Sequence, residues 1–326
     1  MKASTAGEIK RLVAASWAQS TQASYNTELK KWFQFCEGKG YDPTQPDNEK
    51  GLAFLVWLHD TKKAKHSTIK NARSAMSAFT PTQSNTTFGK DNMVARVLKG
   101  MFRERPRIPR KVLIYDTNTV IQYLSSLPSN KELLLETLTK KLVTLLCILS
   151  GQRSQSIAYL YEQHMHKSDT LFTFYIPKQL KTTTDTFHQE PLEFEAFPPD
   201  PNTCVYKCLE EYLSRTQLLR ENLPIPEEGK LALILSYAYP HYPVKSATLA
   251  RYVKDMLGCA GIDLTVFTTH STRSASTSKA NNLGLSLKDI SKAAGWRGPS
   301  TFQRFYKFKV SKNFGTELLK AAHRDV

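Results

Sequence analysis

Three side chains of this sequence could together bind an anion. His270 and Arg273 lie three positions apart in a polar segment, and residues at that spacing share one face of a helix. Arg153 follows a long apolar stretch in a Ser-Gly-Gln-Arg turn, where the N-terminus of a new helix would help its guanidinium to bind an anion. Both patterns are short enough to recur by chance, and an ordinary surface or capping arginine is the alternative at position 153.

A tryptophan and a tyrosine farther along the chain could serve the same site. Trp296 follows a glycine, and residues 300–306 would form a short helix that carries Tyr306. A tyrosine hydroxyl is a potential nucleophile. Because the chain has 14 tyrosines, packing is the alternative role for any one of them, and Tyr306 gains interest only from its neighbours.

The sequence predicts neither a metal site nor a cofactor site. His164 and His166 are too close together for one metal-binding face of a helix, and Cys204 and Cys208 have no second pair of ligands at zinc spacing. A packed helix face is the expected place for both cysteines. The sequence contains no GxxxxGK phosphate-binding loop, so nucleotide hydrolysis is not expected.

The composition is that of a globular protein with a polyanionic partner. The 326 residues include 45 Lys and Arg against 29 Asp and Glu, a net charge of +16, and residues 1–111 alone carry +11. This excess suggests nucleic acid as the partner, although a merely soluble basic protein has the same composition.

No apolar run approaches the ~20 residues that cross a bilayer, so no membrane partner is expected. Five cysteines, an odd number, suggest a reducing compartment without disulfides.

The first hundred residues predict a compact all-helical domain. Ser20-Thr21, Asp47 and Ser67 are suitable N-caps for its first three helices. In the third helix, Lys70, Arg73 and Ser77 share one face, which could follow a DNA backbone or could simply be solvated. The helices are expected at 20–36, 51–59, 68–79 and 91–103.

A basic linker is predicted to follow this domain. Residues 103–111 contain two prolines and five cations, which indicates an extended segment rather than a core element. Its Arg105, Arg107 and Arg110 could lie against DNA, or the run could act as a nuclear import signal. The domain boundary is therefore expected at 106–111.

The rest of the chain predicts a mainly α fold with a small antiparallel β-sheet. Two β-like segments, 171–176 and 190–197, are joined by a polar stretch rich in threonine, which indicates a hairpin or small meander. From residue 269 onward the pattern is helical again. Helices are also expected at 117–126, 131–149, 204–220 and 246–259.

The order of the candidate residues resembles that of the tyrosine recombinases, the phage integrase family. The segments Ser-Gly-Gln-Arg153, His270-Ser-Thr-Arg-Ser-Ala-Ser and Ala-Gly-Trp296 are similar to those of eukaryotic transposon enzymes of the Crypton and DIRS-like type. The resemblance implies three regions. These are a helical core-binding domain over 1–105, a linker over 106–111, and a catalytic domain over 112–326 whose last helix docks on a neighbouring protomer.

The resemblance also implies roles for individual residues. Tyr306 would attack a phosphodiester to form a 3′-phosphotyrosine, while Arg153 and Arg273 stabilise the charge on the non-bridging oxygens. Trp296 would pack the site and donate its indole N–H, and His270 would act as general base or as donor to the phosphate. A hairpin lysine would protonate the leaving oxygen. Lys181 is the preferred candidate, with Lys178 as its alternative and as a backbone-phosphate contact.

Two positions depart from the pattern of many bacterial members. Ser156 stands where those enzymes have an acidic residue, and Tyr306 follows Trp296 at an interval of ten positions rather than nine. One extra residue turns a helix by ~100°, so the segment 297–299 is expected to absorb it. The eukaryotic transposon enzymes share the longer interval, so it is interpreted as a feature of that lineage.

The resemblance implies double-stranded DNA as partner, a dimer on one site, a tetramer in the synaptic complex, and the nucleus as location.

Three other functions are alternatives to a recombinase. A domesticated DNA-binding protein without activity would lack competent residues at some of the six candidate positions, and all six are filled here. A nicking–closing topoisomerase would use the same chemistry, but the N-terminal helical domain is typical of a recombinase. A metal-dependent transposase would need an acidic triad, and none is evident in the sequence.

Overall fold

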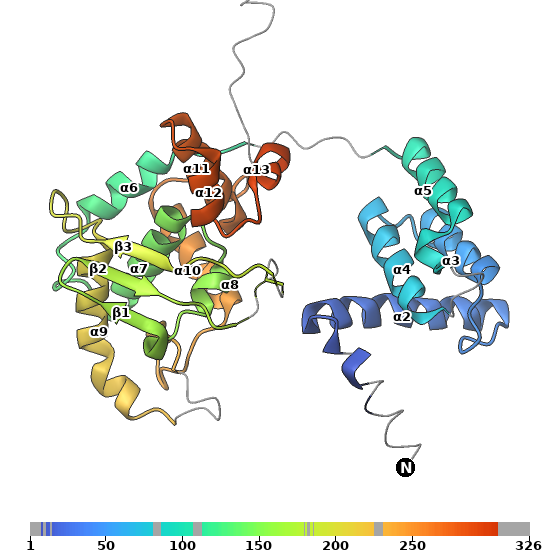
Figure 1. Ribbon diagram of the computed structural model, residues 1–326, viewed down its shortest axis with the longest axis horizontal. Helices are drawn as coiled ribbons and strands as arrows, with labels where there is room; N and C mark the ends of the chain where they lie inside the picture. The colour runs from blue at the N-terminus through green and yellow to red at the C-terminus, as the bar shows by residue number, and fades with distance from the viewer. Residues whose placement is uncertain are drawn as a thin grey trace, which may run out of the picture. The chain divides into compact units, whose positions relative to one another are not determined.

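The chain folds into two compact units, Met1–Arg110 and Lys111–Val326, each built around its own apolar core (Figure 1). The computed structural model describes residues 8, 11–13, 15–80, 86–106, 113–178, 180, 183–184, 186–224 and 231–305, except the side chains of 303–305.

The described part of the N-terminal unit is helical, as the sequence predicts. Trp32, Phe35, Phe54, Leu58 and Met76 are among the side chains of its core, each at most 2% exposed. Burying aromatic side chains of this size supplies much of the stability of a small helical domain. Its elements are α2 (Gln19–Lys39), α3 (Asn48–Asp60), α4 (His66–Phe79), the short 3-10 helix η1 (Phe88–Lys90) and α5 (Asn92–Glu104).

Of the three predicted N-caps in this unit, one is confirmed and two are wrong. The N-cap of α2 is Ala18, so Ser20 and Thr21 lie inside that helix. The side chain of Asp47 accepts a hydrogen bond from the backbone N–H of Lys50 at the start of α3. The N-cap of α4 is Lys65, not Ser67, and Lys65 makes no side-chain capping bond. Ser67 lies one residue inside the helix, where its backbone is already helical and its hydroxyl no longer occupies the capping position.

The C-terminal unit is a helical assembly with a three-stranded antiparallel sheet, which confirms the predicted fold class (Figure 1). Four predicted helices are present, two of them, at 117–126 and 246–259, with unchanged bounds. The elements are α6 (Thr117–Ser126), α7 (Leu135–Ser150), α8 (Ser154–Ala158), η2 (Glu162–His164), β1 (Met165–Lys167), β2 (Leu171–Phe174), β3 (Leu192–Glu195), α9 (Val205–Glu221), α10 (Ser246–Cys259), α11 (Thr269–Asn282), α12 (Leu287–Ala293) and α13 (Pro299–Phe305).

The sheet has the order β1-β2-β3, with Phe172 opposite Phe194 in the β2–β3 pair. It packs on α9, where the rings of Phe172 and Tyr206 lie 4.7 Å apart. The hairpin predicted between β2 and β3 is therefore present. The sequence did not predict β1, because three residues with one apolar side chain carry no alternating pattern.

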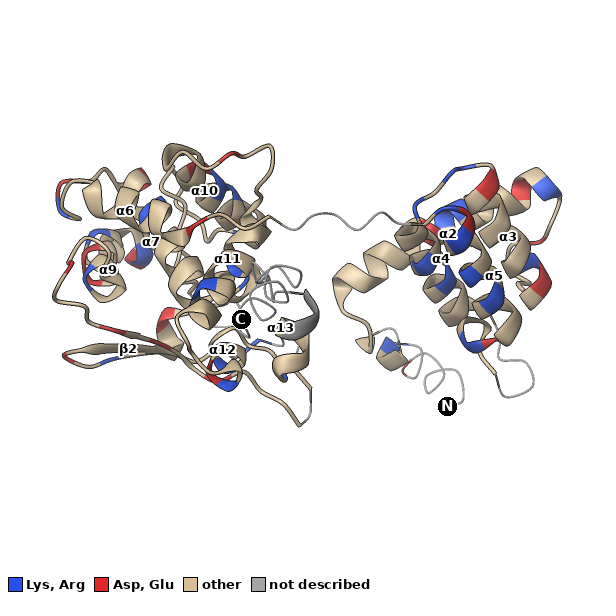
Figure 2. Ribbon diagram, turned by 90° about the horizontal axis from the view of Figure 1, so that it is seen from above, with Lys and Arg blue, Asp and Glu red and all other residues tan. Residues whose placement is uncertain are grey.

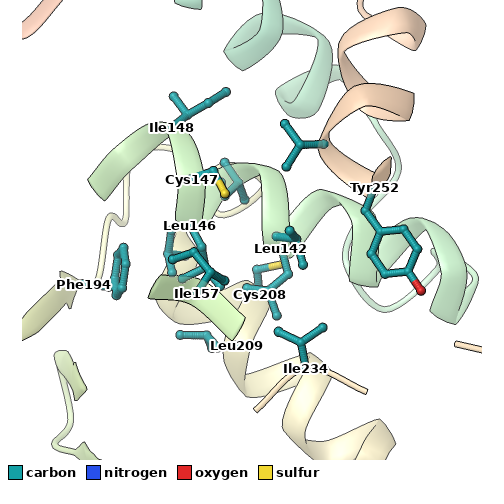
Figure 3. Packing of buried hydrophobic residues seen from close by; sticks show 14 of the residues in the cluster. Leu142, Leu146, Cys147, Ile148, Ile157, Phe194, Cys208, Leu209, Ile234 and Tyr252 are labelled. Atoms are coloured by element: carbon teal, nitrogen blue, oxygen red, sulfur yellow. The ribbon is translucent and has the colours of Figure 1, made fainter. Parts of the chain in front are cut away.

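Helix α7 is the central element of the C-terminal unit. It is buried on nearly every side, and α9, α10 and α11 all pack against it. Figure 3 shows Leu142, Leu146 and Cys147 of this helix among side chains from α8, α9 and α10. The helix ends at Gly151 in the left-handed conformation, with φ of 62°, so the Ser-Gly-Gln-Arg turn is held at the end of the most buried helix of the unit.

Lys141 of α7 is a buried cation without a hydrogen bond. Its side chain is 0% exposed, and no described residue accepts a hydrogen bond from its Nζ. Burial lowers the pKa of Lys141, while the Cys208 thiol and the Asp200 carboxylate act weakly in the opposite direction.

We expect Lys141→Met to stabilise the C-terminal unit by about 1–3 kcal/mol at pH 7, because it removes an unsatisfied buried donor. A lowered pKa in the folded state means that the unfolded chain binds a proton that the folded chain does not. The wild-type free energy of unfolding should therefore rise with pH up to the ordinary lysine range, and Lys141→Met should lose this dependence. Urea unfolding at several pH values measures both effects.

The neighbouring Lys140 provides the matched control. Its Nζ lies 2.9 Å from carboxylate oxygens of both Glu136 and Asp255. Lys140→Met should therefore destabilise the unit. If Lys141→Met behaves in the same way, Lys141 has a partner or is solvated, and the interpretation is wrong.

Candidate functional site

Arg273 connects three parts of the chain that are far apart in sequence. It lies on α11 and is 2% exposed. Its NH1 donates to the carbonyl oxygen of Gly151 at 2.9 Å, and its guanidinium carbon lies 4.6 Å from the centre of the Trp296 ring. The end of α7, the start of α11 and the segment after α12 are thus held together around one arginine.

A cavity of about 260 Å³ opens beside this arginine. Arg153, the N-cap residue of the five-residue helix α8, and His270, the second residue of α11, both line it. A pocket of this size with two guanidinium groups and an imidazole can bind a phosphate. The lining residues are Cys147, Gln152, Arg153, Ser154, Gln155, Ala250, Thr269, His270, Thr272 and Arg273.

The surroundings of His270 favour a neutral imidazole. Desolvation of the ring lowers its pKa below the ordinary histidine value, and the positive charges of Arg153 and Arg273 lower it further. A neutral imidazole can accept a proton at neutral pH. The start of α11 is fixed by a capping box between Thr268 and Ser271, and by the Thr269 hydroxyl, which donates to the Ala250 carbonyl at 2.7 Å.

Trp296 packs in a small cluster with the helices on either side of it. It is 3% exposed, and its ring centre lies 5.9 Å from that of Phe302 on α13. The segment 297–298 separates Trp296 from α13, whose first residue is Pro299, a position that tolerates the missing N–H. The end of α13 thus lies directly before Tyr306, which is outside the described residues.

The loop between β2 and β3 contacts the segment after Trp296. Arg297 donates from NH2 to the Thr184 hydroxyl at 3.3 Å. Lys178 of the same loop has its Nζ 5.7 Å and 5.8 Å from the ring centres of Tyr159 and Tyr161. Lys181, the preferred lysine, is outside the described residues.

The structure therefore brings together four of the six candidate catalytic residues. Arg153, His270 and Arg273 line one cavity, and Trp296 stacks on Arg273. Gln152, which the sequence analysis did not single out, lines the cavity as well. Its signal in the sequence is its place between Gly151 and Arg153 in the turn.

The candidate DNA-binding side chains of the N-terminal unit differ in their exposure and in their hydrogen bonds within the unit. Lys70 is exposed on α4, and Figure 2 shows other basic residues on α2, α4 and α5. The Ser77 hydroxyl accepts a hydrogen bond from the Gly89 backbone N–H at 3.0 Å, and this bond does not use the O–H that would donate to a phosphate. Arg73 is half-buried on the same helix.

Arg105 is held by the helices rather than extended from them. It caps α5, and its guanidinium donates to His59, from Nε to the ring Nε2 at 2.9 Å and from NH2 to the backbone oxygen at 2.5 Å. A contact with DNA through Arg105 would thus compete with these bonds. Arg107 and Arg110 lie outside the described residues.

Within the described ranges, no group of three or more His, Cys, Asp or Glu side chains is placed to hold a metal ion. Cys204 and Cys208 are buried in the core with free thiols. None of the helices that the structure describes combines the length and apolar character needed to cross a bilayer.

The family model described as the phage integrase family matches residues 125–311. This match covers more than half of the chain and every candidate catalytic position from Arg153 to Tyr306. The chain belongs to the phage integrase family. No curated protein sequence matches it.

Solved structures of family recombinases share the fold of this integrase-family chain. XerH recombinase in a post-cleavage complex with a palindromic difH substrate is 15% identical, with 92% of this chain and 78% of that chain covered and a TM-score of 0.59. The Tn1549 transposon integrase in complex with transposon right end DNA is 13% identical, with 85% of each chain covered and a TM-score of 0.54. A lambda integrase dimer on a COC′ core site is 15% identical, with 96% and 97% covered and a TM-score of 0.50.

Proposed function

We propose that this chain is a site-specific DNA recombinase, a transposon integrase that cleaves and rejoins DNA through a covalent 3′-phosphotyrosine without metal or ATP. The observation that carries the proposal is the cavity that Arg153, His270 and Arg273 share, next to Trp296 and to the helix that leads to Tyr306. Family membership and the DNA complexes of the similar structures support it.

The reaction is a transesterification, in which a phosphoester bond to tyrosine replaces the phosphoester bond that is broken in the DNA. The Tyr306 hydroxyl gives its proton to His270 as its oxygen attacks the scissile phosphorus, a phosphotyrosine bond forms, and the bond to the 5′ oxygen breaks. Arg153 and Arg273 stabilise the added negative charge on the non-bridging oxygens. Lys181 gives a proton to the departing 5′ oxygen, and the reverse reaction rejoins a strand without ATP.

The pH dependence of cleavage tests the role of His270 as general base. The base must be unprotonated, and its lowered pKa keeps it so at neutral pH. Single-turnover cleavage should therefore stay constant from about pH 8 down to about pH 6.5, the ordinary histidine pKa, and fall only below it. His270→Gln should lower the rate constant by about 10²–10⁴-fold and remove this dependence.

An exposed histidine on β1 supplies the control for this experiment. His166→Asn should leave the profile unchanged. A rate that instead rises as the pH falls below 6.5 would mean that protonated His270 donates to the phosphate.

Alanine at each hairpin lysine separately tests the general acid. Lys181→Ala should slow cleavage by about 10²-fold or more, whereas a substrate with a 5′-sulfur leaving group, which needs no proton, should restore the rate. Lys178→Ala should weaken DNA binding with a smaller effect on the rate, because Lys178 lies over Tyr159 and Tyr161. If the 5′-sulfur substrate rescues Lys178→Ala and not Lys181→Ala, the two assignments are reversed.

We infer double-stranded DNA as the partner, with a dimer on one site and a tetramer in the synaptic complex. The positive charge of residues 1–111, with Lys70, Arg73, Ser77 and the linker arginines, supplies sequence-independent affinity. We infer as well that the C-terminal helix implied by the resemblance, which falls outside the described residues, docks on a neighbouring protomer. The motifs shared with Crypton and DIRS-like enzymes support a eukaryotic mobile element, with the nucleus as the place of action.

A nicked duplex in EDTA tests the proposal directly. Cleavage beside the nick releases a short strand and traps the covalent adduct, whose modified peptide mass spectrometry should assign to Tyr306. An adduct in EDTA excludes a metal-dependent transposase, and its absence in every buffer supports a DNA-binding protein without activity. Relaxation of supercoiled DNA without strand exchange between two sites would favour a topoisomerase.

A further inference from the structure

A buried glutamine amide connects the phosphate-binding turn with the segment before Trp296. Gln152 is 3% exposed, and its Nε2 donates to the carbonyl oxygen of Ala293 at 2.6 Å. Ala293 is the last residue of α12. Gln152 lies between Gly151, which accepts a hydrogen bond from Arg273, and Arg153 of the cavity.

A second glutamine contacts the same segment from the loop between β2 and β3. Gly295 has φ of 64°, and a Cβ atom built on it would lie 2.5 Å from Gln189 Oε1 and 3.2 Å from Gln152 Nε2. The amides of both glutamines therefore lie directly against the backbone of Gly295. A side chain at this position would displace at least the Gln189 amide.

The segment that the two amides contact has only a small apolar cluster of its own. Ile290, Ala294, Trp296 and Phe302 form a group that is separate from the main core of the unit. A small cluster buries little apolar surface, so a few buried polar contacts contribute substantially to fixing its position relative to the rest of the unit. Gln152 and Gln189 supply such contacts, one from the anion cavity and one from the hairpin loop.

We propose that Gln152 and Gln189 are positioning residues, which hold Trp296 and α13 in register with the arginine pair and with the hairpin loop. The inference rests on the proposed function, because the register matters only if α13 delivers a nucleophile to the phosphate. A misplacement of the reacting groups by about 1 Å can cost about 10²-fold in rate. The two amides therefore couple the nucleophile and the general acid to one phosphate site.

Gln152→Met tests the first contact, because methionine has nearly the same shape and no donor. Hydrogen–deuterium exchange of the full chain should increase in peptides from 287–305 and stay unchanged in those from α7 and α10. Single-turnover cleavage should slow by about 10- to 100-fold, while the DNA concentration for half-maximal rate changes less than about 2-fold. Gln217→Met, the same change on the exposed face of α9, should alter neither measurement.

A double-mutant cycle tests the second contact. Gln189→Ala should slow cleavage by about 5- to 10-fold at little cost in stability, because its buried Nε2 has no hydrogen-bond partner among the described residues. Gly295→Ala should slow cleavage further, since alanine disfavours the left-handed backbone and displaces the Gln189 amide. The double variant should be no more than about 2-fold slower than Gly295→Ala alone. Losses that simply multiply would show that the Gln189 contact has no role.

The two readouts separate this inference from the proposed function. If the wild type forms no covalent adduct while Gln152→Met still increases exchange over 287–305, the proposed function fails and the contact stands as structural. If the wild type cleaves and Gln152→Met cleaves at the same rate, the positioning role is overturned. Loss of folding in Gln152→Met would appear as increased exchange throughout the unit, and the smaller Gln152→Ala would then have to reproduce the local effect for the inference to survive.

Discussion

Replacing Tyr306 by phenylalanine is expected to abolish the covalent protein–DNA adduct while leaving DNA affinity within about 2-fold. The change removes one oxygen atom, and the benzene ring cannot attack phosphorus. Loss of the nucleophile lowers the rate of cleavage by at least about 10⁴-fold, because the arginines, the histidine and the lysine can only assist an attack on phosphorus that phenylalanine cannot make. Denaturing gel electrophoresis of the nicked substrate measures the adduct, and gel mobility shift measures affinity.

The same substitution at an exposed tyrosine provides the matched control. Tyr242 is 55% exposed in the loop before α10, and Tyr242→Phe should form the adduct at the wild-type rate. An adduct that persists in Tyr306→Phe would show that another residue is the nucleophile. The arrangement of α12, Trp296 and α13 would then have to serve packing alone.

The sequence predicted most of the helices, because helices leave a local signal. Helix α10 has buried apolar side chains that recur every three to four residues, and its predicted bounds, 246–259, are those observed. Helix α7 was predicted four residues too long at its start, since Leu133 and Leu134 continue the apolar run although the helix begins at Leu135. Short elements such as β1 depend on a partner strand, and their sequences carry no such information.

The candidate site was predictable as a set of residues but not as a geometry. The types and order of Arg153, His270 and Arg273 indicate phosphate chemistry, and the structure places all three at one cavity. The bonds that hold the cavity together join residues 122 and 141 positions apart, Arg273 to Gly151 and Gln152 to Ala293. No local pattern specifies such contacts, because they depend on the packing of α11 and α12 beside α7.

Intramolecular partners were equally invisible in the sequence. Ser77 and Arg105 belong to patterns that suggest DNA contacts, yet each already bonds within the N-terminal unit, to Gly89 and to His59. Arg105 must give up hydrogen bonds of its own to reach a phosphate, and Ser77, whose hydroxyl can still donate, carries no charge. Lys70, which is exposed, is therefore expected to contribute more of the salt-dependent affinity than Ser77 or Arg105.

Replacing Arg273 by lysine is expected to lower the rate constant of cleavage by about 10³-fold, although the charge is kept. The planar guanidinium donates to Gly151 through NH1 and lies over the Trp296 ring. A lysine ammonium is a point charge that cannot stack, hold the turn and bind a phosphate oxygen at once. The loss should appear in the rate and much less in DNA affinity, because the developing charge exists only in the transition state.

A buried arginine elsewhere in the unit provides a control that distinguishes an effect on catalysis from an effect on folding. Arg220 is 7% exposed and donates to the carbonyl oxygens of Ala232 and Leu233. Arg220→Lys should cost about as much stability as Arg273→Lys, since each removes a planar donor from backbone acceptors, but it should leave the single-turnover rate of the folded protein unchanged. Equal losses of rate in both variants would mean that Arg273 acts through the fold. A loss confined to Arg273→Lys would place its guanidinium on the reacting phosphate.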